Sequence, residues 1–192
     1  MDLRCFIAIE IPEEIKREMH AIIDILRTTG ADVKWIPAEN LHLTLKFLGK
    51  TPEPVIIPIT EVLGKKMLSY SPFYITISHV GCFPDRRRPR ILWIGADQAE
   101  VMKKMHGDIE NEMEQFGFSA ENRAFHAHVT IGRVRSRNRV RPVIRKLDEY
   151  ASHNFGTCEV RNISLIKSEL SPSGARYKTL AQIPLGRRNN VE

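Results

Sequence analysis

The chain contains the stretch His42-Leu43-Thr44-Leu45, and 86 residues later it contains His128-Val129-Thr130-Ile131. In both stretches a histidine and a threonine alternate with apolar residues. Because successive side chains of a β-strand point to opposite faces, each stretch predicts a strand whose histidine and threonine share one face. Two strands of this kind predict two matching halves of one site.

The elements around these stretches also repeat. At the same offset, Phe6-Ile7-Ala8-Ile9 aligns with Leu92-Trp93-Ile94-Gly95, and both predict short buried strands. In each copy an amphipathic helical pattern follows, over residues 13–28 and 98–116. The order of strand, helix and His-x-Thr strand therefore occurs twice, which predicts a duplicated fold with two lobes related by a pseudo-twofold axis.

Strands and helices that alternate with short connections are typical of an α+β fold. We expect two antiparallel-rich sheets flanking a central cleft, with the helices on the outside. No Gly/Ser-rich or Pro-rich linker divides the 192 residues, so we expect a single domain over residues 1–192. The sequence predicts strands near residues 3–10, 34–37, 41–48, 72–80, 90–96, 118–121, 125–133, 156–168 and 175–183, and helices near 13–28, 53–68, 98–116 and 139–151.

The charge of the chain favours a polyanionic partner. The net charge is +6 and the sequence pI is about 9.4. Arginines gather in residues 86–90 and again in residues 133–146, directly after the second His-x-Thr strand. This placement indicates contact with a nucleic-acid backbone.

The remaining composition bounds the setting of the protein. The three cysteines Cys5, Cys82 and Cys158 are scattered, with no Cys-x-x-Cys pair, which suits a reducing cytoplasm and disfavours a thiolate metal site. The chain has no apolar run of membrane-spanning length and no secretory leader pattern. We expect a cytoplasmic monomer that binds no membrane.

Two imidazoles on either side of one phosphorus atom could act together as general base and general acid. Threonine hydroxyls two residues further along could donate hydrogen bonds to the non-bridging phosphate oxygens. The motif strands carry no Asp or Glu, which argues against a two-metal phosphoesterase. A zinc site with histidine ligands is the competing interpretation, although no carboxylate or thiolate completes it. We expect no cofactor.

With these residues in view, the chain resembles the 2H phosphoesterase superfamily, and within it the RNA 2′,3′-cyclic phosphodiesterases, historically called 2′-5′ RNA ligases. The resemblance covers nearly the whole chain. Its blocks are Arg4–Pro12 (RCFIAIEIP), Lys34–Gly49 (KWIPAENLHLTLKFLG), Pro89–Gly95 (PRILWIG), Phe125–Arg133 (FHAHVTIGR) and Leu170–Leu185 (LSPSGARYKTLAQIPL).

The resemblance implies metal-independent opening of a 2′,3′-cyclic phosphate at an RNA end to leave a 2′-phosphate, and in some members the reverse 2′-5′ joining of RNA ends. It implies that His42 donates a proton to the leaving 3′ oxygen and that His128 accepts the proton of the attacking water. Thr44 and Thr130 would hold the phosphate. From the residues alone, a symmetric pair leaves the donor and acceptor roles open.

Four further residues are candidates for substrate binding. The family usually has proline immediately before the second histidine; here that residue is Ala127, and His126 is an additional histidine expected on the face of His128. Lys46 is expected on the face of His42. Arg133 reaches the face of His128 only if the strand twists or bulges at Gly132. Tyr177 is a candidate for stacking on a terminal base.

Two other functions remain open from the sequence. One is an RNA-binding module without catalysis that uses the same basic surface. The other is a phosphodiesterase that acts on a small cyclic nucleotide.

Overall fold

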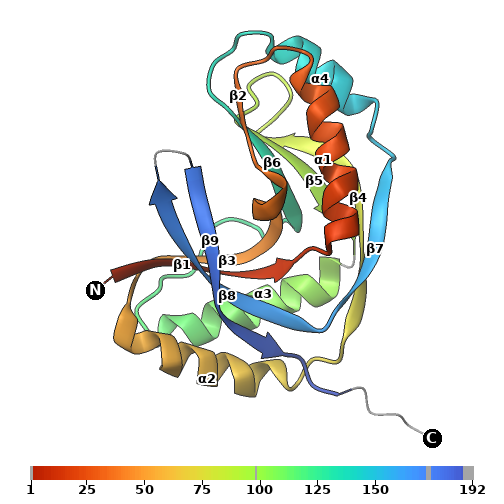
Figure 1. Ribbon diagram of the computed structural model, residues 1–192. Coiled ribbons are helices and arrows are strands. Elements are labelled where there is room, and N and C mark those ends of the chain that lie inside the picture. Colours follow the sequence, from red (N-terminus) through yellow and green to blue (C-terminus); the bar gives the residue numbers. More distant parts are fainter. Residues whose placement is uncertain (1, 98, 172–173, 188–192) are drawn as a thin grey trace, which may run out of the picture.

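The computed structural model describes residues 2–97, 99–171 and 174–187, and shows a curled antiparallel sheet with four α-helices on its outer side (Figure 1). The helices are α1 (Glu13–Arg27), α2 (Ile56–Met67), α3 (Ala99–Glu114) and α4 (Val140–Asp148), with short 3-10 turns at Ala38–Asn40 and Glu53–Val55. The strands are β1 (Asp2–Glu10), β2 (Val33–Trp35), β3 (His42–Pro52), β4 (Phe73–Phe83), β5 (Ile91–Ala96), β6 (His128–Val134), β7 (Asn154–Val160), β8 (Asn162–Ser171) and β9 (Gly174–Pro184). The prediction of an α+β fold is confirmed.

The two predicted sheets are halves of one continuous sheet. The strand order is β7-β4-β5-β6-β3-β1-β8-β9, and β2 pairs with β6 beside this row. The first half-sheet consists of β3, β1, β8 and β9, and the second consists of β2, β6, β5, β4 and β7. A single residue pair, Leu43 with Val129, joins them where β3 meets β6. The two motif strands are therefore neighbours at the centre of the fold.

Helices α1 and α3 each pack against the half-sheet that does not contain the strand preceding them in the chain. Helix α1 follows β1 in the chain, but it packs against β7 of the second half-sheet and against helix α4 beside it. Helix α3 follows β5, but it packs against α2 and β3 of the first half-sheet. Gly156 on β7 has no side chain, and Ile15 of α1 fills that space, since a Cβ there would lie 2.9 Å from Ile15 Cγ1. Each half-sheet thus takes its cover from both halves of the sequence.

A bulge interrupts β3 directly after its motif threonine. Thr44 pairs with Ala8, but Lys46 pairs with Ile7, so Leu45 is an extra residue on this strand. As a result Leu45 and Lys46 are both buried, and the next side chain, Phe47, returns to the exposed side. The regular alternation that the sequence predicts for residues 41–48 ends at this bulge.

Strand β6 has a bulge at the matching position. Thr130 pairs with Trp93 and Gly132 pairs with Leu92, so Ile131 is the extra residue. Ile131 and Gly132 are both buried, and Arg133 returns to the exposed side. Both motif strands therefore change their inside-outside alternation one residue after the threonine, which extends the pseudo-twofold relation to backbone detail.

Most of the predicted elements are present, and one is wrong. Residues 118–121 form irregular chain instead of a strand, because other groups take their backbone hydrogen bonds. The strand predicted over 156–168 is divided into β7 and β8. The block Leu170–Leu185 falls at the end of β8 and along β9, which pair antiparallel, and residues 172–173 lie outside the described residues.

Candidate active site

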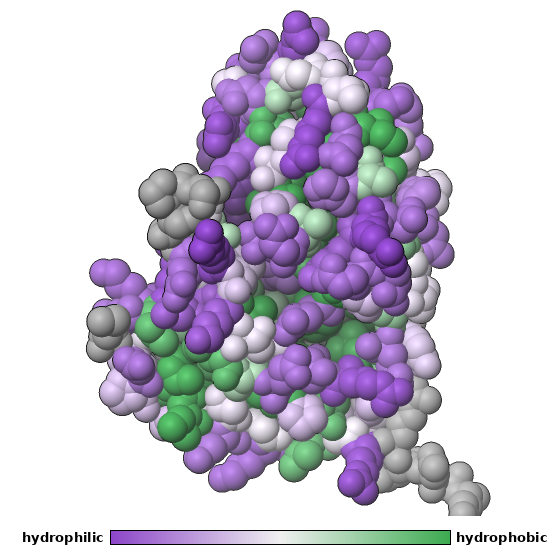
Figure 2. Space-filling view, viewed as in Figure 1, coloured by the Kyte–Doolittle hydropathy of each residue, from purple (hydrophilic) through white to green (hydrophobic). Residues whose placement is uncertain are grey.

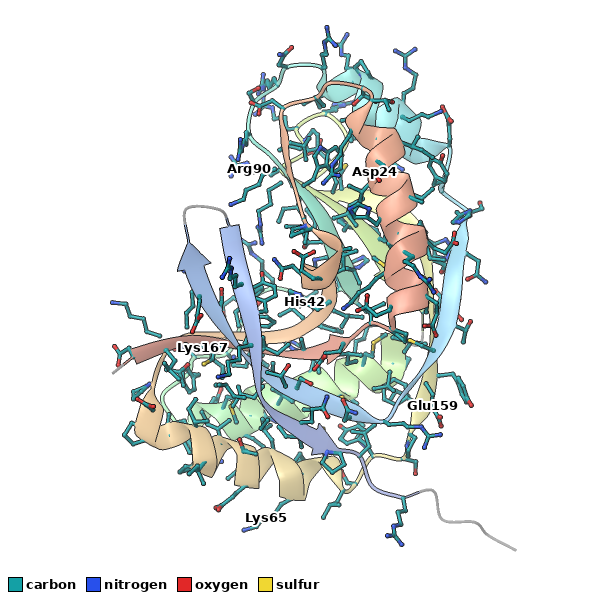
Figure 3. The ribbon with its side chains drawn as sticks, in the orientation of Figure 1. Asp24, His42, Lys65, Arg90, Glu159 and Lys167 are labelled. Atoms are coloured by element: carbon teal, nitrogen blue, oxygen red, sulfur yellow. The ribbon has the colours of Figure 1, made fainter. Side chains whose placement is uncertain are left out.

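His42 and His128 each open a motif strand on the face of the sheet that lies away from the helices. Their apolar neighbours Leu43 and Val129 are fully buried in the main core, whereas both histidines are only partly covered. The antiparallel register about the Leu43–Val129 pair places His42 across from Thr130. By the same register Thr44 lies across from His128. In Figure 3, His42 lies near the middle of the molecule, between the two half-sheets.

A backbone carbonyl two residues earlier holds each imidazole. The Nδ1 atom of His42 lies 2.7 Å from the carbonyl oxygen of Asn40, and Nδ1 of His128 lies 2.6 Å from that of His126. A carbonyl only accepts hydrogen bonds, so in both rings Nδ1–H is the donor. In the neutral imidazole this leaves Nε2 unprotonated and able to accept a proton. Both rings therefore present the same nitrogen to the open face.

Aromatic side chains surround each histidine. Phe6 stacks on His42 with 4.6 Å between ring centroids, and Tyr177 meets the same imidazole edge-on at 5.2 Å. Phe83 lies edge-on to His128 at 5.1 Å, and Trp93 lies 6.3 Å away. These rings exclude water from one side of each imidazole and restrict its rotation.

This partial burial lowers the pKa of both histidines. Burial is the largest cause in His42, and with the positive charges of Lys16 and Arg133 it lowers the pKa to about 4, against the opposing hydrogen bond to Asn40. Burial also lowers the pKa of His128, to which His126 and Arg133 contribute. Both imidazoles are therefore neutral at pH 7 in the free protein.

The two motif threonines are partly exposed beside the imidazoles. Thr44 and Thr130 share the open face with His42 and His128, as the sequence predicts. Within the described part of the chain, neither hydroxyl makes a hydrogen bond. Both hydroxyls are thus available as donors to an anion on this face.

Arg133 lies on the open face because of the bulge at Ile131. Its positive charge lowers the pKa of both His42 and His128, so the guanidinium stands near both rings. Lys34 of β2 pairs with Arg133, and two like charges directly across a strand pair repel each other. This pair of cations beside the histidines favours an anion at this place.

Tyr177 and His126 are both close to the imidazoles. Tyr177 comes from β9, and burial raises the pKa of its phenol. His126 precedes β6 instead of lying on it, with its ring 5.3 Å from Trp93. Its clearest contact with the site is through its backbone, since its carbonyl holds His128.

Lys46 does not face the site, which corrects the prediction. The bulge at Leu45 turns its side chain to the helix side of the sheet, where only 1% of it is exposed. There its ammonium donates hydrogen bonds to Glu110 Oε2 at 2.6 Å and to the carbonyl oxygen of Ser119 at 3.0 Å. Lys46 is thus committed to a buried ion pair and is not available to a phosphate on the open face.

The sequence did not single out several groups that shape the site. The carbonyl oxygens of Asn40 and His126 carry no side-chain signal. The sequence predicts Phe6 and Trp93 only as parts of strands, and Phe83 lies outside every predicted element. The structure pairs Trp93 with Thr130 as it pairs Ala8 with Thr44, whereas the 86-residue offset aligns Trp93 with Ile7, so the repeat did not indicate this position.

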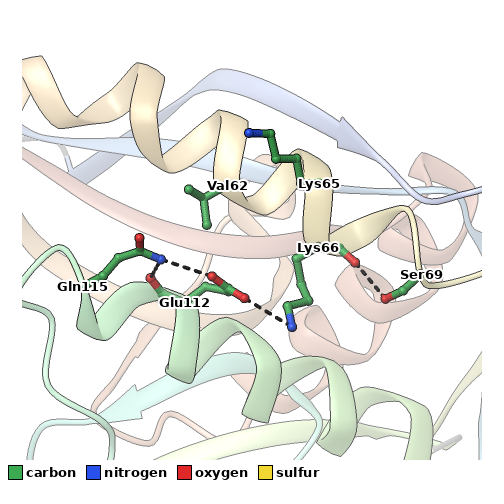
Figure 4. A pocket seen from close by; sticks show the side chains of 6 residues that line it. All are labelled: Val62, Lys65, Lys66, Ser69, Glu112 and Gln115. Atoms are coloured by element: carbon green, nitrogen blue, oxygen red, sulfur yellow. Dashed lines mark hydrogen bonds and ion pairs between the residues drawn. The ribbon is translucent and has the colours of Figure 1, made fainter.

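A hollow elsewhere on the surface lies apart from the histidines (Figure 4). It lies between α2 and α3, where Lys66 Nζ forms an ion pair with Glu112 Oε1 at 3.2 Å. It contains none of the predicted site residues. Over residues 2–97, 99–171 and 174–187, no three His, Cys, Asp or Glu side chains gather as a metal ion would require.

Comparison with known proteins identifies relatives over nearly the whole chain. The model of the LigT like Phosphoesterase family matches twice, over residues 9–93 and 94–177. A protein of Archaeoglobus fulgidus named RNA 2′,3′-cyclic phosphodiesterase is 34% identical over 179 residues, which cover 93% of this chain and 98% of that protein. A Thermotoga maritima protein of the same name is 34% identical over 181 residues, covering 93% of each chain.

Solved structures show the same fold. A crystal structure of a Thermus thermophilus protein matches with a TM-score of 0.77 at 25% identity, covering 97% of this chain and 100% of that one. The structure of E. coli LigT complexed with 3′-AMP matches with a TM-score of 0.78 at 24% identity, covering 96% and 99%. The resemblance drawn from the sequence is confirmed: the chain belongs to the LigT like Phosphoesterase family.

Proposed function

We propose that this protein hydrolyses the 2′,3′-cyclic phosphate at an RNA end to a 2′-phosphate, with His42 and His128 as its general acid and base. The relatives named RNA 2′,3′-cyclic phosphodiesterase support the reaction. The observation that carries the mechanism is the matched pair of imidazoles, each held at Nδ1 by a carbonyl and each presenting Nε2 to the same open face.

The proposed reaction has two coupled proton transfers. His128 Nε2 takes a proton from water as the water oxygen attacks phosphorus. The bond from phosphorus to the 3′ oxygen breaks, and protonated His42 gives its Nε2 proton to that oxygen. The hydroxyls of Thr44 and Thr130 donate to the non-bridging oxygens, and Arg133 offsets their negative charge. A proton then passes from His128 to His42 through solvent, so the net change is the addition of one water molecule.

The protonation states impose a condition on this assignment. In the free protein His42 has a pKa of about 4, and burial lowers the pKa of His128 from its ordinary value. The proposed active form, with His42 protonated and His128 neutral, is therefore a small fraction at pH 7. A bound phosphodiester anion favours the protonated form of a nearby imidazole, which raises the population of this active form in the complex.

The same arrangement accommodates the joining of RNA ends. A 5′-hydroxyl of a second strand in the place of water would give a 2′-5′ phosphodiester and a free 3′-hydroxyl. No additional group on the protein is needed, because His128 would take the proton of that hydroxyl and His42 would again protonate the 3′ oxygen.

An exposed arginine cluster beside the site favours RNA over a small cyclic nucleotide as the substrate. The loops that carry it meet, since Val134 N donates to Arg90 O at 2.9 Å and Arg135 N donates to Asp32 O at 2.9 Å. Figure 2 shows that this upper part of the molecule is largely hydrophilic, and Figure 3 places Arg90 there, above His42. The arginine cluster comprises Lys34, Arg87, Arg88, Arg90, Arg133, Arg135, Arg137, Arg139 and Arg141.

No member of the arginine cluster forms an ion pair with another described residue, in contrast to Arg86, which binds Asp148 at 2.7 Å. These charges are free to bind the phosphates of the strand that leads to the reacting end. On the other side of His42, Tyr177 and the exposed ring of Phe47 lie over the buried ring of Phe6, and together these two offer an aromatic surface on which a terminal base could stack.

The test is incubation of the purified protein with an oligoribonucleotide ending in a 2′,3′-cyclic phosphate, in the presence of EDTA. We expect turnover that is independent of added metal and falls by about 10²-fold or more in His42→Ala and in His128→Ala, with both variants folded. Salt-sensitive binding without turnover would instead indicate an RNA-binding module. Turnover of a cyclic mononucleotide as fast as of the oligonucleotide would indicate a small-molecule substrate.

A further inference from the structure

A buried polar cluster on the helix side of the sheet connects the two motif strands. Lys46 of β3 and Glu110 of α3 form an ion pair of 2.6 Å, with side-chain exposures of 1% and 8%. A buried ion pair of this kind gives little net stability compared with apolar residues of the same size. Its position directly behind the site therefore points to a role other than stability.

The cluster binds the β3 bulge on one side. His106 of α3 donates its Nδ1–H to the carbonyl oxygen of Leu45 at 2.9 Å. Leu45 is the extra residue of the bulge, and it directly follows Thr44. The bulge, which turns Lys46 inward and Phe47 outward, is thus fixed to helix α3 at two consecutive residues.

On its other side the cluster binds the irregular segment that leads into β6. Lys46 donates to the carbonyl oxygen of Ser119, and the backbone N–H of Glu121 donates to Glu110 Oε2 at 3.0 Å. Phe125 stacks on His106 with 4.5 Å between ring centroids and an interplanar angle of 21°. Three points of residues 118–127, which form no regular structure, are therefore held by side chains of the cluster.

This segment ends in the carbonyl that orients His128. Phe125 is followed by His126, whose carbonyl oxygen accepts the Nδ1–H of His128. The carbonyl of Ala127 accepts the backbone N–H of Ala96 at 3.1 Å, which fixes the end of the segment to β5. The other imidazole has a separate support, because Asn40 binds the carbonyl oxygen of Ala175 at 2.8 Å through its side chain.

We propose that Lys46, Glu110 and His106 are positioning residues that act through residues 118–127 to hold His128 in the tautomer with a free Nε2. This inference rests on the proposed function for its effect on turnover, but its effect on the imidazole can be measured without any reaction. If the segment loosens, the His126 carbonyl no longer selects Nδ1–H, and neutral His128 populates both tautomers. His42 keeps its own carbonyl and its own tautomer.

The test compares Lys46→Met and Phe125→Leu with Lys66→Met. Lys66→Met is the matched control, because it also removes an ion pair to α3 but does not touch residues 118–127. Phe125→Leu loosens the segment without leaving a buried charge unpaired, so it keeps the test valid if Lys46→Met does not fold. The ring nitrogens of His42 and His128 are observed by ¹⁵N NMR at a pH where both are neutral.

We expect mixed tautomers at His128, and an unchanged His42, in both segment variants, with the control like the wild type. For hydrolysis, kcat should fall by about 10-fold to 100-fold with KM within about twofold, as misplacement of a catalytic group predicts. A His128 that keeps Nδ1–H in both variants would overturn the proposal, as would equal changes at both histidines. If the wild type is inactive on cyclic phosphates, the proposed function fails while the NMR result still decides this inference.

Discussion

The roles of the two histidines can be separated by changing the leaving group. If His42 protonates the 3′ oxygen, its loss should cost about 10²-fold to 10⁴-fold in rate, the usual contribution of a general acid. Replacing the bridging 3′ oxygen by sulfur gives a thiolate leaving group, whose conjugate acid has a pKa of about 8.5 by analogy with cysteine. Such a group leaves without protonation.

The structure makes this experiment decisive, because the lowered pKa of His42 in the free protein disfavours the protonated form that a general acid needs. A histidine with a pKa of about 4 gives up its proton more readily than one with the ordinary value of about 6.5, by at most about 3 kcal/mol. The free protein thus opposes a protonated His42, whereas the resemblance assigns the proton to His42. In the proposed mechanism the bound anion must offset this cost by raising the pKa of His42.

The assay measures kcat/KM for oxygen and sulfur substrates with the wild type, His42→Ala and His128→Ala. We expect His42→Ala to recover to within about tenfold of the wild type on the sulfur substrate, while His128→Ala stays impaired by about 10²-fold or more on both. Recovery of His128→Ala instead of His42→Ala would refute the assignment and exchange the two roles. Equal loss on both substrates in both variants would refute general acid catalysis by either histidine.

Three further outcomes follow from the same geometry. Unfolded His42 binds protons at a higher pH than folded His42, because the folded protein lowers the pKa of this imidazole. As the pH drops from about 6.5 to about 4, the free energy of unfolding of the wild type should therefore fall by at most about 3 kcal/mol relative to that of His42→Asn, as urea denaturation would measure. A difference that does not change with pH would contradict the lowered pKa. The double variant Arg87→Gln, Arg88→Gln should reduce the slope of log K against log salt concentration for oligonucleotide binding by about 1.4, and it should leave cyclic mononucleotide turnover unchanged. An unchanged slope would show that these two arginines do not bind the RNA. Arg133→Gln should raise the pKa of His42, which an NMR titration would check, and should reduce kcat/KM on the oligonucleotide and on the cyclic mononucleotide. A lower pKa of His42 in this variant would contradict the proximity of the Arg133 guanidinium.

The period of two along the motif strands was sufficient to predict the face shared by each histidine and its threonine. The same rule failed one residue later. In residues 42–47 (HLTLKF) polar and apolar residues continue to alternate, so this pattern predicts Lys46 on the face of His42. The bulge at Leu45 is set by pairing with β1, which is distant in sequence, and by the attraction of Glu110 for the ammonium of Lys46.

Other features depend on contacts that a linear pattern does not contain. The carbonyls of Asn40 and His126 are backbone groups, so no residue type indicates that they hold the imidazoles. Residues 118–121 resemble a strand, yet their backbone groups bind Lys46 and Glu110 instead of a neighbouring strand. The exchange of α1 and α3 between the half-sheets follows from packing across the whole fold. Within the described residues, no helix is both long and apolar enough to cross a membrane.

The most direct test of the central claim is to identify the bond that breaks. The cyclic-phosphate-ended oligoribonucleotide is turned over in ¹⁸O-labelled water, with EDTA present, and the product is examined by phosphorus NMR and mass spectrometry. We predict a 2′-phosphate with a free 3′-hydroxyl, carrying one labelled oxygen on phosphorus, and formation of this product slowed by about 10²-fold or more in His42→Ala and in His128→Ala. A 3′-phosphate product, or turnover within about tenfold of the wild-type rate after the loss of either histidine, would contradict the proposed mechanism.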